Sequence, residues 1–168
     1  KFAQLIRQTL NNSREPYISV ETEIETLTKY LDLEKMRFKD KFSYSINNLL
    51  DAQEVTLKIP SMLIQPFVEN AVIHGFSTLD SGGKIDITLQ PVDQYQILCI
   101  IEDNGVGRRK TFKQSSKTHV SFGTTITEER LKAFEAKHGI HFNIQTIDIE
   151  NEDGSTGTKV RINLPIMY

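Results

Sequence analysis

The stretch PFVENAVIHG, residues 66–75, decides the fold because it places one short helix between two pairs of predicted strands. Pro66 is tolerated only in or near the first turn of a helix, so we expect the regular helix to begin near Gln65 and to stop at the final glycine. Asn70 and His74 are one helical turn apart and share a face, while the apolar residues around them can face a sheet. The helix therefore has one polar face and one buried face.

Strand patterns lie on both sides of that helix. Six strands are expected, at residues 42–47, 54–59, 84–91, 95–102, 141–149 and 158–164. A capping box at Thr125 and Glu128 opens a further helix before the last pair, and Gly139 closes it. Because strands arrive in pairs instead of alternating singly with helices, the order predicts an α+β, two-layer sandwich.

Two helices precede the strands. Residues 2–12 have the pattern of the end of one helix, and a second is predicted over 19–37. An apolar stripe runs along the second helix from Val20 to Leu31. Such a stripe is either plain core or a dimer seam, and the pattern leaves both open.

The composition is that of a globular domain, with 38% hydrophobic and 25% charged residues. A formal net charge of −2 gives no global field for nucleic acid, so we expect no nucleic-acid partner. The single cysteine, Cys99, excludes an internal disulfide and fits a reducing compartment. No apolar run approaches the roughly 20 residues of a membrane-spanning helix, so we expect a cytoplasmic domain. The chain begins at Lys1, and we expect an upstream part.

A second polar motif, DNGVG at residues 103–107, directly follows the apolar strand 95–102. Asp-Asn-Gly is also a common turn, so the motif alone leaves a plain turn open. A carboxylate such as Asp103 at the end of a buried strand can accept a hydrogen bond from an exocyclic amine such as the adenine N6. Gly105 and Gly107 would let the backbone approach a flat ring closely.

Two further features suit an anionic ligand. Five basic residues follow the glycine motif: Arg108, Arg109, Lys110, Lys113 and Lys117. They form either a lid over a polyphosphate or a solvated loop. Residues 121–125 lead into the N-terminus of the capped helix, which favours phosphate. The amide of Asn70 can offer a neutral oxygen to a hard cation such as magnesium, although a polar helix face can also be simple surface.

In this order the motifs resemble the nucleotide-binding boxes of the GHKL superfamily of ATPases and kinases. Residues 66–75 resemble its N box, 103–107 its G1 box, 121–131 its G2 box, and Gly157-Thr158 its last turn. The segment LTKYLDLEKMRF, residues 27–38, is similar to the region that precedes this domain in LytS-type sensor histidine kinases. The chain is therefore identified as a member of that family.

The resemblance implies the Bergerat fold, an α+β two-layer sandwich whose mixed sheet is covered by helices on one face, with N-terminal helices before it. Residues 1–40 would end the dimerisation and phosphoacceptor region, and 41–168 would form the ATP-binding catalytic domain. ATP and Mg²⁺ are the implied cofactors. The implied nucleotide-binding residues are Asn70, His74, Asp103, Gly105, Gly107, Gly123 and Thr158. Asn70 would coordinate magnesium, Asp103 would bind the adenine amine, and Thr158 would support the adenine site.

The implied activity is transfer of the ATP γ-phosphate to a histidine upstream of this chain, for relay to a response regulator. None of the four histidines here has a phosphoacceptor context. A homodimer and a membrane anchor in the full-length protein are also implied. Two alternatives stay open. A GHKL ATPase would need a glutamate where Pro66 stands. A non-catalytic module is kept open by departures from the family pattern at Ile73, Ser121 and Ile126.

Overall fold

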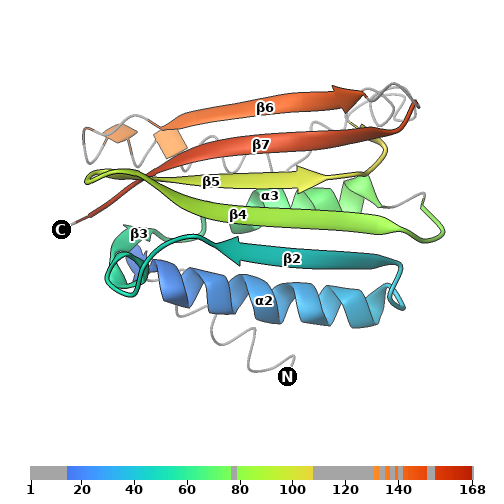
Figure 1. Cartoon of the computed structure of the whole chain (residues 1–168), viewed down its shortest axis with the longest axis horizontal. Coiled ribbons are helices and arrows are strands. Elements are labelled where there is room, and N and C mark those ends of the chain that lie inside the picture. The colour runs from blue at the N-terminus through green and yellow to red at the C-terminus, as the bar shows by residue number, and fades with distance from the viewer. Residues whose placement is uncertain are drawn as a thin grey trace.

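The computed structural model describes residues 15–76, 79–107, 131–132, 135–136, 139, 142–150 and 154–167. Its elements are β1 (Tyr17–Ser19), α2 (Val20–Arg37), β2 (Phe42–Asn48), a 3-10 helix (Glu54–Thr56), β3 (Lys58–Pro60), α3 (Gln65–Asn70), a π-helix (Ala71–Gly75), β4 (Gly83–Asp93), β5 (Gln96–Asp103), β6 (Asn143–Glu150) and β7 (Thr156–Pro165), as Figure 1 shows. Among these residues, no helix is long and apolar enough to cross a membrane.

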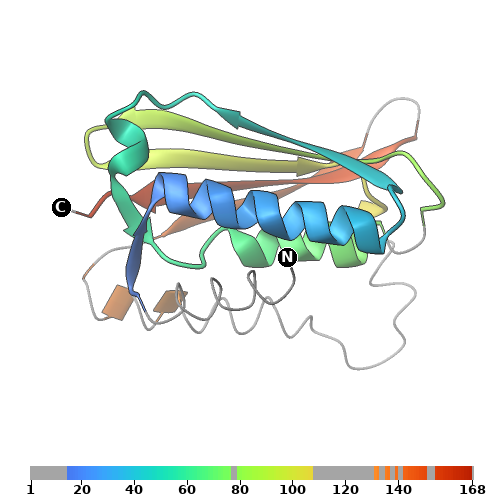
Figure 2. The ribbon, with the colours of Figure 1, turned by 90° about the horizontal axis from the view of Figure 1, so that it is seen from below.

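The main sheet has five strands in the order β2-β4-β5-β7-β6. The pair β2 and β4 is parallel, and the other three pairs are antiparallel, so the sheet is mixed. Figure 2 shows α2 and α3 together on one side of this sheet. The prediction of an α+β, two-layer sandwich with a mixed sheet covered on one face is confirmed.

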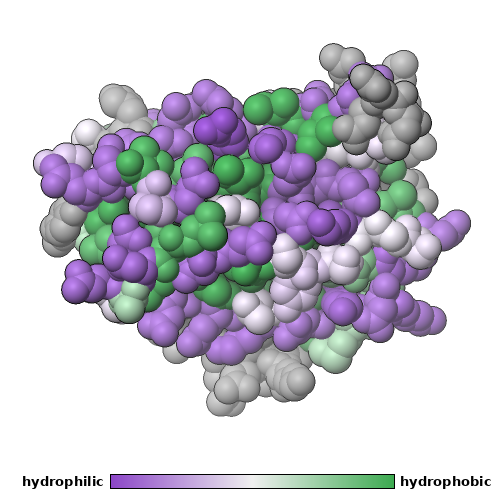
Figure 3. Space-filling model, viewed as in Figure 1, coloured by the Kyte–Doolittle hydropathy of each residue, from purple (hydrophilic) through white to green (hydrophobic). Residues whose placement is uncertain are grey.

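The core lies between the helices and the sheet. On β4, alternate residues Ile85, Ile87 and Leu89 are completely buried, as the period-two pattern predicts. From α2, Val20 and Leu31 are also completely buried and belong to the same apolar cluster. The stripe on the second predicted helix is therefore core packing. The opposite face of the sheet mixes polar and apolar side chains (Figure 3).

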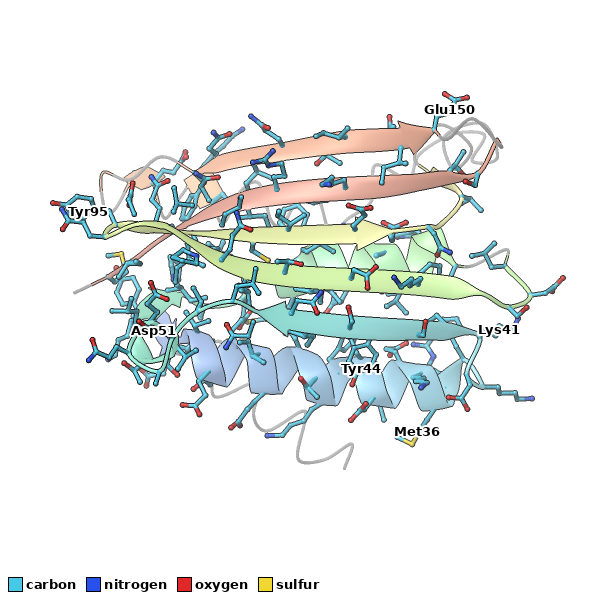
Figure 4. All side chains as sticks on the ribbon, viewed as in Figure 1. Met36, Lys41, Tyr44, Asp51, Tyr95 and Glu150 are labelled. Atoms are coloured by element: carbon cyan, nitrogen blue, oxygen red, sulfur yellow. The ribbon has the colours of Figure 1, made fainter. Side chains whose placement is uncertain are left out.

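Local signals explain the position of α2. Ser19 lies just before the helix with extended backbone, and its hydroxyl accepts a hydrogen bond from the Thr22 backbone. On the sheet side, the hydroxyl of Tyr44 donates a 2.5 Å hydrogen bond to Asp32 of α2. Figure 4 shows Tyr44 between β2 and that helix. The helix predicted over 19–37 is thus confirmed to within one residue.

The strand predicted at 54–59 is wrong. Asp51 Oδ1 accepts hydrogen bonds from the backbone N–H groups of Gln53 and Glu54, both at 2.8 Å, and these bonds wind the chain into a 3-10 turn. Only β3 remains extended. It pairs with β1, whose strand conformation no pattern predicted, and the two form a small separate sheet.

The predicted stop at Gly139 is confirmed. Its φ of +66° is left-handed, and its N–H donates to the Glu135 carbonyl at 2.8 Å, as expected of the residue that ends a helix. The helix predicted over 2–12, the basic residues 108–117, the G2 segment with Gly123, and the capping box at Thr125 lie outside the described residues.

Candidate functional site

The helix of the decisive stretch begins at Gln65 and has Pro66 in its first turn, as predicted. Its α-helical part ends at Asn70, and residues 71–75 form a π-helix that no sequence signal indicated. Val68 and Val72 are completely buried in the core, whereas Asn70 is half-buried and His74 is exposed. A single π turn inside a helix often marks a functional site.

Asp103 is the last residue of β5, the central strand, and its side chain is only 7% exposed. Its Oδ1 accepts a 2.8 Å hydrogen bond from the Gly105 backbone. Burial raises the pKa of this carboxyl to about 6, against hydrogen bonds from the Gly105 and Thr158 backbone that lower it. Asp103 is therefore mostly ionised at neutral pH, and its charge is costly to bury.

The backbone of the glycine motif at residues 103–107 contacts the backbone at the end of the helical segment. A Cβ atom on Gly105 would lie 2.6 Å from both the Cα and the carbonyl oxygen of Gly75, and 2.8 Å from Asp103 Oδ1. The Val106 N–H donates a 3.1 Å hydrogen bond to the Gly75 carbonyl. Gly105 therefore has no room for a side chain, and a Cβ atom on Gly75 would lie 3.3 Å from Asp103 Oδ1, so these two glycines bring the helix end against Asp103.

The start of β7 completes the arrangement. Thr158 is the strand partner of Asp103, and a Cβ atom on Gly157 would collide with the Asp103 carbonyl oxygen. Thr156 donates a 3.0 Å hydrogen bond from its hydroxyl to the Gly105 carbonyl. Gly107 has a left-handed φ of +70°, beside the Thr156 side chain.

The structure thus gathers four of the predicted site residues in one place: Asp103, Gly105, Gly107 and Thr158. Asn70 and His74 lie on the helical segment that ends at this place. Gly123 lies outside the described residues. Sequence reasoning missed the roles of Gly75 and Thr156. A glycine that is needed for a close backbone contact looks the same in the sequence as any other glycine, so no signal indicated this role.

Comparisons with known proteins found similar histidine kinases. A family model described as histidine kinase matches residues 1–42. The sensor histidine kinase/phosphatase LytS of Staphylococcus aureus strain MRSA252 is 28% identical over 129 residues, which are 77% of this chain and 21% of the relative. LytS of strain Mu50 matches with the same identity and coverage. The chain therefore spans about a fifth of the length of these curated relatives.

Solved structures match the fold. The mycobacterial sensor histidine kinase MprB aligns with a TM-score of 0.60 and 16% identity, over 89% of this chain and 96% of that chain. The catalytic domain of histidine kinase ThkA aligns with a TM-score of 0.58 and 16% identity, over 89% and 93%. ThkA in complex with response regulator TrrA aligns with a TM-score of 0.57 and 15% identity, over 99% and 47%.

The α+β fold matches that of solved histidine kinase catalytic domains. The sequence relatives are LytS sensor histidine kinases, and the N-terminal residues match the histidine kinase family model, so the chain is similar in sequence to that class.

Proposed function

We propose that this chain is the ATP-binding catalytic domain of a sensor kinase, and that it passes the γ-phosphate of ATP to a histidine outside the chain. The observation that carries the proposal is Asp103. A buried carboxylate ends the central strand, and glycine backbone surrounds it. Such a group can accept a hydrogen bond from the adenine amine, while the adjacent backbone leaves room for a flat ring.

The proposed adenine contact has a pH signature. Because burial raises the pKa of Asp103 to about 6, the carboxyl takes up a proton as the pH falls through that value. The protonated oxygen accepts the adenine amine less well than the ionised one. ATP affinity should therefore be constant above neutral pH and should fall in mildly acidic solution.

The proposed magnesium ligand is Asn70. Magnesium prefers oxygen ligands, keeps several waters, and is commonly bound through one or two protein groups together with substrate phosphates. A half-buried amide on the helix that ends beside Asp103 fits this chemistry. When bound, the ion would neutralise negative charge on the phosphates during transfer. We place His74 near the nucleotide, and the basic residues 108–117 with the hinge glycine Gly123 in a lid over the phosphates.

Two observations disfavour ATP hydrolysis by this chain. Pro66, in the first turn of α3, occupies the position where the hydrolytic relatives need a glutamate base. The nearby carboxylate, Glu69, accepts a 2.8 Å hydrogen bond from Gln65. On α2, burial first, and then the charges of Glu34 and Glu69, raise the pKa of Tyr30. Glu69 is therefore engaged on the α2 side of the helix.

The same proposal implies how the full-length protein is organised. Residues 1–40 would end a dimerisation and phosphoacceptor region, and residues 41–168 would form the catalytic domain. The full-length protein would be a homodimer whose partner is a response regulator, and this chain would be its cytoplasmic part behind a membrane anchor. One of the similar structures, ThkA, is a complex with a response regulator.

The first test is a calorimetric titration of ATP into this chain with and without magnesium. We expect binding in both cases and tighter binding with the metal. The second test incubates labelled ATP with the chain alone, and then with the chain extended by its upstream region. We expect no label and no phosphate release from the chain alone, and label on the extended protein.

Three results would contradict the proposal. Absence of ATP binding would remove it altogether. Steady phosphate release from the chain alone would favour an ATPase. An extended protein that binds ATP but stays unlabelled would favour a non-catalytic module, the alternative kept open by Ile73, which is 43% exposed where the family often has a basic residue.

A further inference from the structure

Glu23 is a buried carboxyl on α2 that the nucleotide site does not use. Its side chain is 2% exposed, and its Oε1 has no hydrogen-bond partner among the residues that the structure describes. The backbone N–H of Ile64 donates a hydrogen bond to the same carboxyl. Glutamate is almost never this deeply buried unless it is paired, so this position needs a reason.

Ile64 is the residue that precedes α3. It has helical backbone angles, and its side chain cannot cap the helix. The first N–H groups of any helix lack partners within that helix. Here the missing acceptor comes from another helix, because Glu23 of α2 accepts from the Ile64 backbone. A carboxyl group near a helix start is also favoured by the helix dipole.

The turn before α3 is held in a strained conformation. Met62 has a φ of +58°, in the left-handed region that costs a side-chain-bearing residue about 1 kcal/mol or more. Strained residues persist only where surrounding contacts fix them. Contacts fix the chain on both sides of Met62 in the sequence. Ser61, just before it, is hydrogen-bonded to the segment that enters α2, and Ile64, two residues after it, is hydrogen-bonded to Glu23.

The segment that enters α2 holds the same turn. The Ser61 hydroxyl donates a 2.7 Å hydrogen bond to the Glu15 carbonyl, and the Ser61 N–H donates to the Pro16 carbonyl at 3.1 Å. Directly beside these bonds, β1 pairs with β3, and Tyr17 lies opposite Pro60. Figure 1 shows β3 next to the first turn of α2. The chain entering α2 and the chain entering α3 are therefore joined at several points.

We propose that Glu23 is a positioning residue that fixes the start of α3 relative to α2, and so couples the segment leading in from the upstream region to the magnesium ligand Asn70. The inference rests on the proposed function for its nucleotide part. Asn70 is five positions after Gln65 on one continuous helix, so a displacement of the helix start also moves the proposed ligand. Glu23 acts through α3 and touches no nucleotide.

The test compares Glu23→Leu, Glu23→Gln and the control Glu25→Leu in this chain. Glu25 is an exposed residue of the same helix, in a surface ion pair with Lys29. Three quantities are measured: ATP affinity without metal, the magnesium-dependent gain in affinity, and amide hydrogen exchange at residues 64–68. Glutamine retains an oxygen that accepts from the Ile64 N–H, whereas leucine has no acceptor.

We expect Glu23→Leu to reduce the magnesium-dependent gain about tenfold and to speed exchange at residues 64–68, because loss of a group that orients a metal ligand commonly weakens metal binding by that factor or more. Glu23→Gln and Glu25→Leu should behave as the parent chain does. Unchanged exchange and unchanged magnesium gain in Glu23→Leu would overturn the inference. So would equal losses in Glu23→Gln and Glu23→Leu, since the hydrogen bond would then not matter.

The two proposals fail in different ways. If the parent chain binds no ATP, the proposed function is wrong, and exchange at residues 64–68 alone decides whether Glu23 fixes the start of α3. If the parent chain binds Mg-ATP and Glu23→Leu binds it equally well with unchanged exchange, the proposed function stands and the positioning role is wrong.

Discussion

The helical segment from Gln65 to Gly75 has a buried carboxyl group at each end, and the two groups differ in their surroundings. At its start, Glu23 receives one backbone hydrogen bond and keeps Oε1 without a partner among the described residues. At its end, Asp103 receives hydrogen bonds from the Gly105 and Thr158 backbone. Burial is the largest cause of the raised pKa in both, which is about 7 for Glu23 and about 6 for Asp103.

This difference separates a structural acceptor from a ligand-binding one. Asp103 is mostly ionised at neutral pH, and the neighbouring Gly75 and Gly105 add no side chains beside its carboxylate, as the proposed adenine contact requires. Glu23 is close to half protonated at neutral pH and is buried in the protein interior. Its contribution to the structure therefore comes from its hydrogen bond with the Ile64 backbone and not from its charge. We therefore expect an added side chain at Gly105, beside the end of the segment, to be disruptive. At the start of the segment, replacing Glu23 by a neutral residue that still accepts a hydrogen bond should be tolerated.

The largest effect is expected for Gly105→Ala. The new methyl group would lie 2.6 Å from two backbone atoms of Gly75, which cannot rotate away, so the helix end and the loop must separate. We expect a loss of about 3 kcal/mol or more in the free energy of unfolding, together with loss of ATP binding. Chemical denaturation and calorimetry measure the two.

The control is Gly82→Ala. Gly82 has a left-handed φ of +80° but nothing within 4 Å of a new Cβ atom, so we expect a loss of only about 1 kcal/mol and unchanged ATP binding. Equal losses at the two positions would show that backbone conformation, and not the contact with Gly75, makes Gly105 necessary.

The next effect concerns the pH dependence of stability through Glu23. A carboxyl whose pKa rises on folding from 4.5 to about 7 binds more protons when folded, so stability falls as the pH rises through that interval and is constant above it. The contribution is about 3 kcal/mol. In Glu23→Gln this part of the pH dependence should be absent, while the part due to Asp103 remains.

Denaturation of both chains at about pH 5 and about pH 8 measures this difference. The parent chain should lose more stability than Glu23→Gln over that interval. If the two curves stay parallel, the carboxyl has the same pKa in both states, and Glu23 is not the desolvated group that its burial indicates.

Much of this fold could be predicted from the sequence, because the decisive signals are local. Pro66 fixes the helix start, and alternate apolar residues fix the buried faces of the central strands. Asp103 and Thr158 could be expected in one site only through the resemblance to the nucleotide-binding boxes, and the pairing of β5 with β7 places them opposite each other. The strand predicted at 54–59 failed because hydrogen bonds to Asp51 outweighed the apolar alternation there.

Glu23 shows why part of the site could not be predicted. It lies three residues after Val20 and four before Leu27, on the apolar stripe of α2, so its position indicates burial. Its residue type indicates exposure, and spacing alone does not decide between the two. Its partner, the Ile64 backbone, is 41 positions away in the sequence (64 minus 23) and carries no side-chain signal at all. No sequence signal indicates the π-helix at residues 71–75 either.

A smaller effect is expected for Asp103→Asn on ligand binding. The amide offers an N–H group where the adenine amine needs an acceptor, which leaves a buried polar group unpaired. The expected loss of ATP affinity is about 1–3 kcal/mol, or roughly 5- to 150-fold. Glu102→Gln is the control, because Glu102 precedes Asp103 on the same strand and forms a partly exposed ion pair with Lys159. Unchanged affinity in a folded Asp103→Asn chain would remove the adenine assignment.

The smallest effect on stability is expected for Asn70→Ala. Asn70 is half-buried at the junction of α3 and the π-helix, and alanine is the best helix former, so the free energy of unfolding should change by less than about 1 kcal/mol. The magnesium-dependent gain in ATP affinity should disappear, while metal-free binding through Asp103 persists. Asn47→Ala, at an exposed asparagine of β2, controls for loss of an amide. A chain that keeps its full magnesium gain would show that the helix does not hold the metal. A chain that fails to fold would make Asn70 structural, and the contrast between the two ends of the segment would then rest on Asp103 alone.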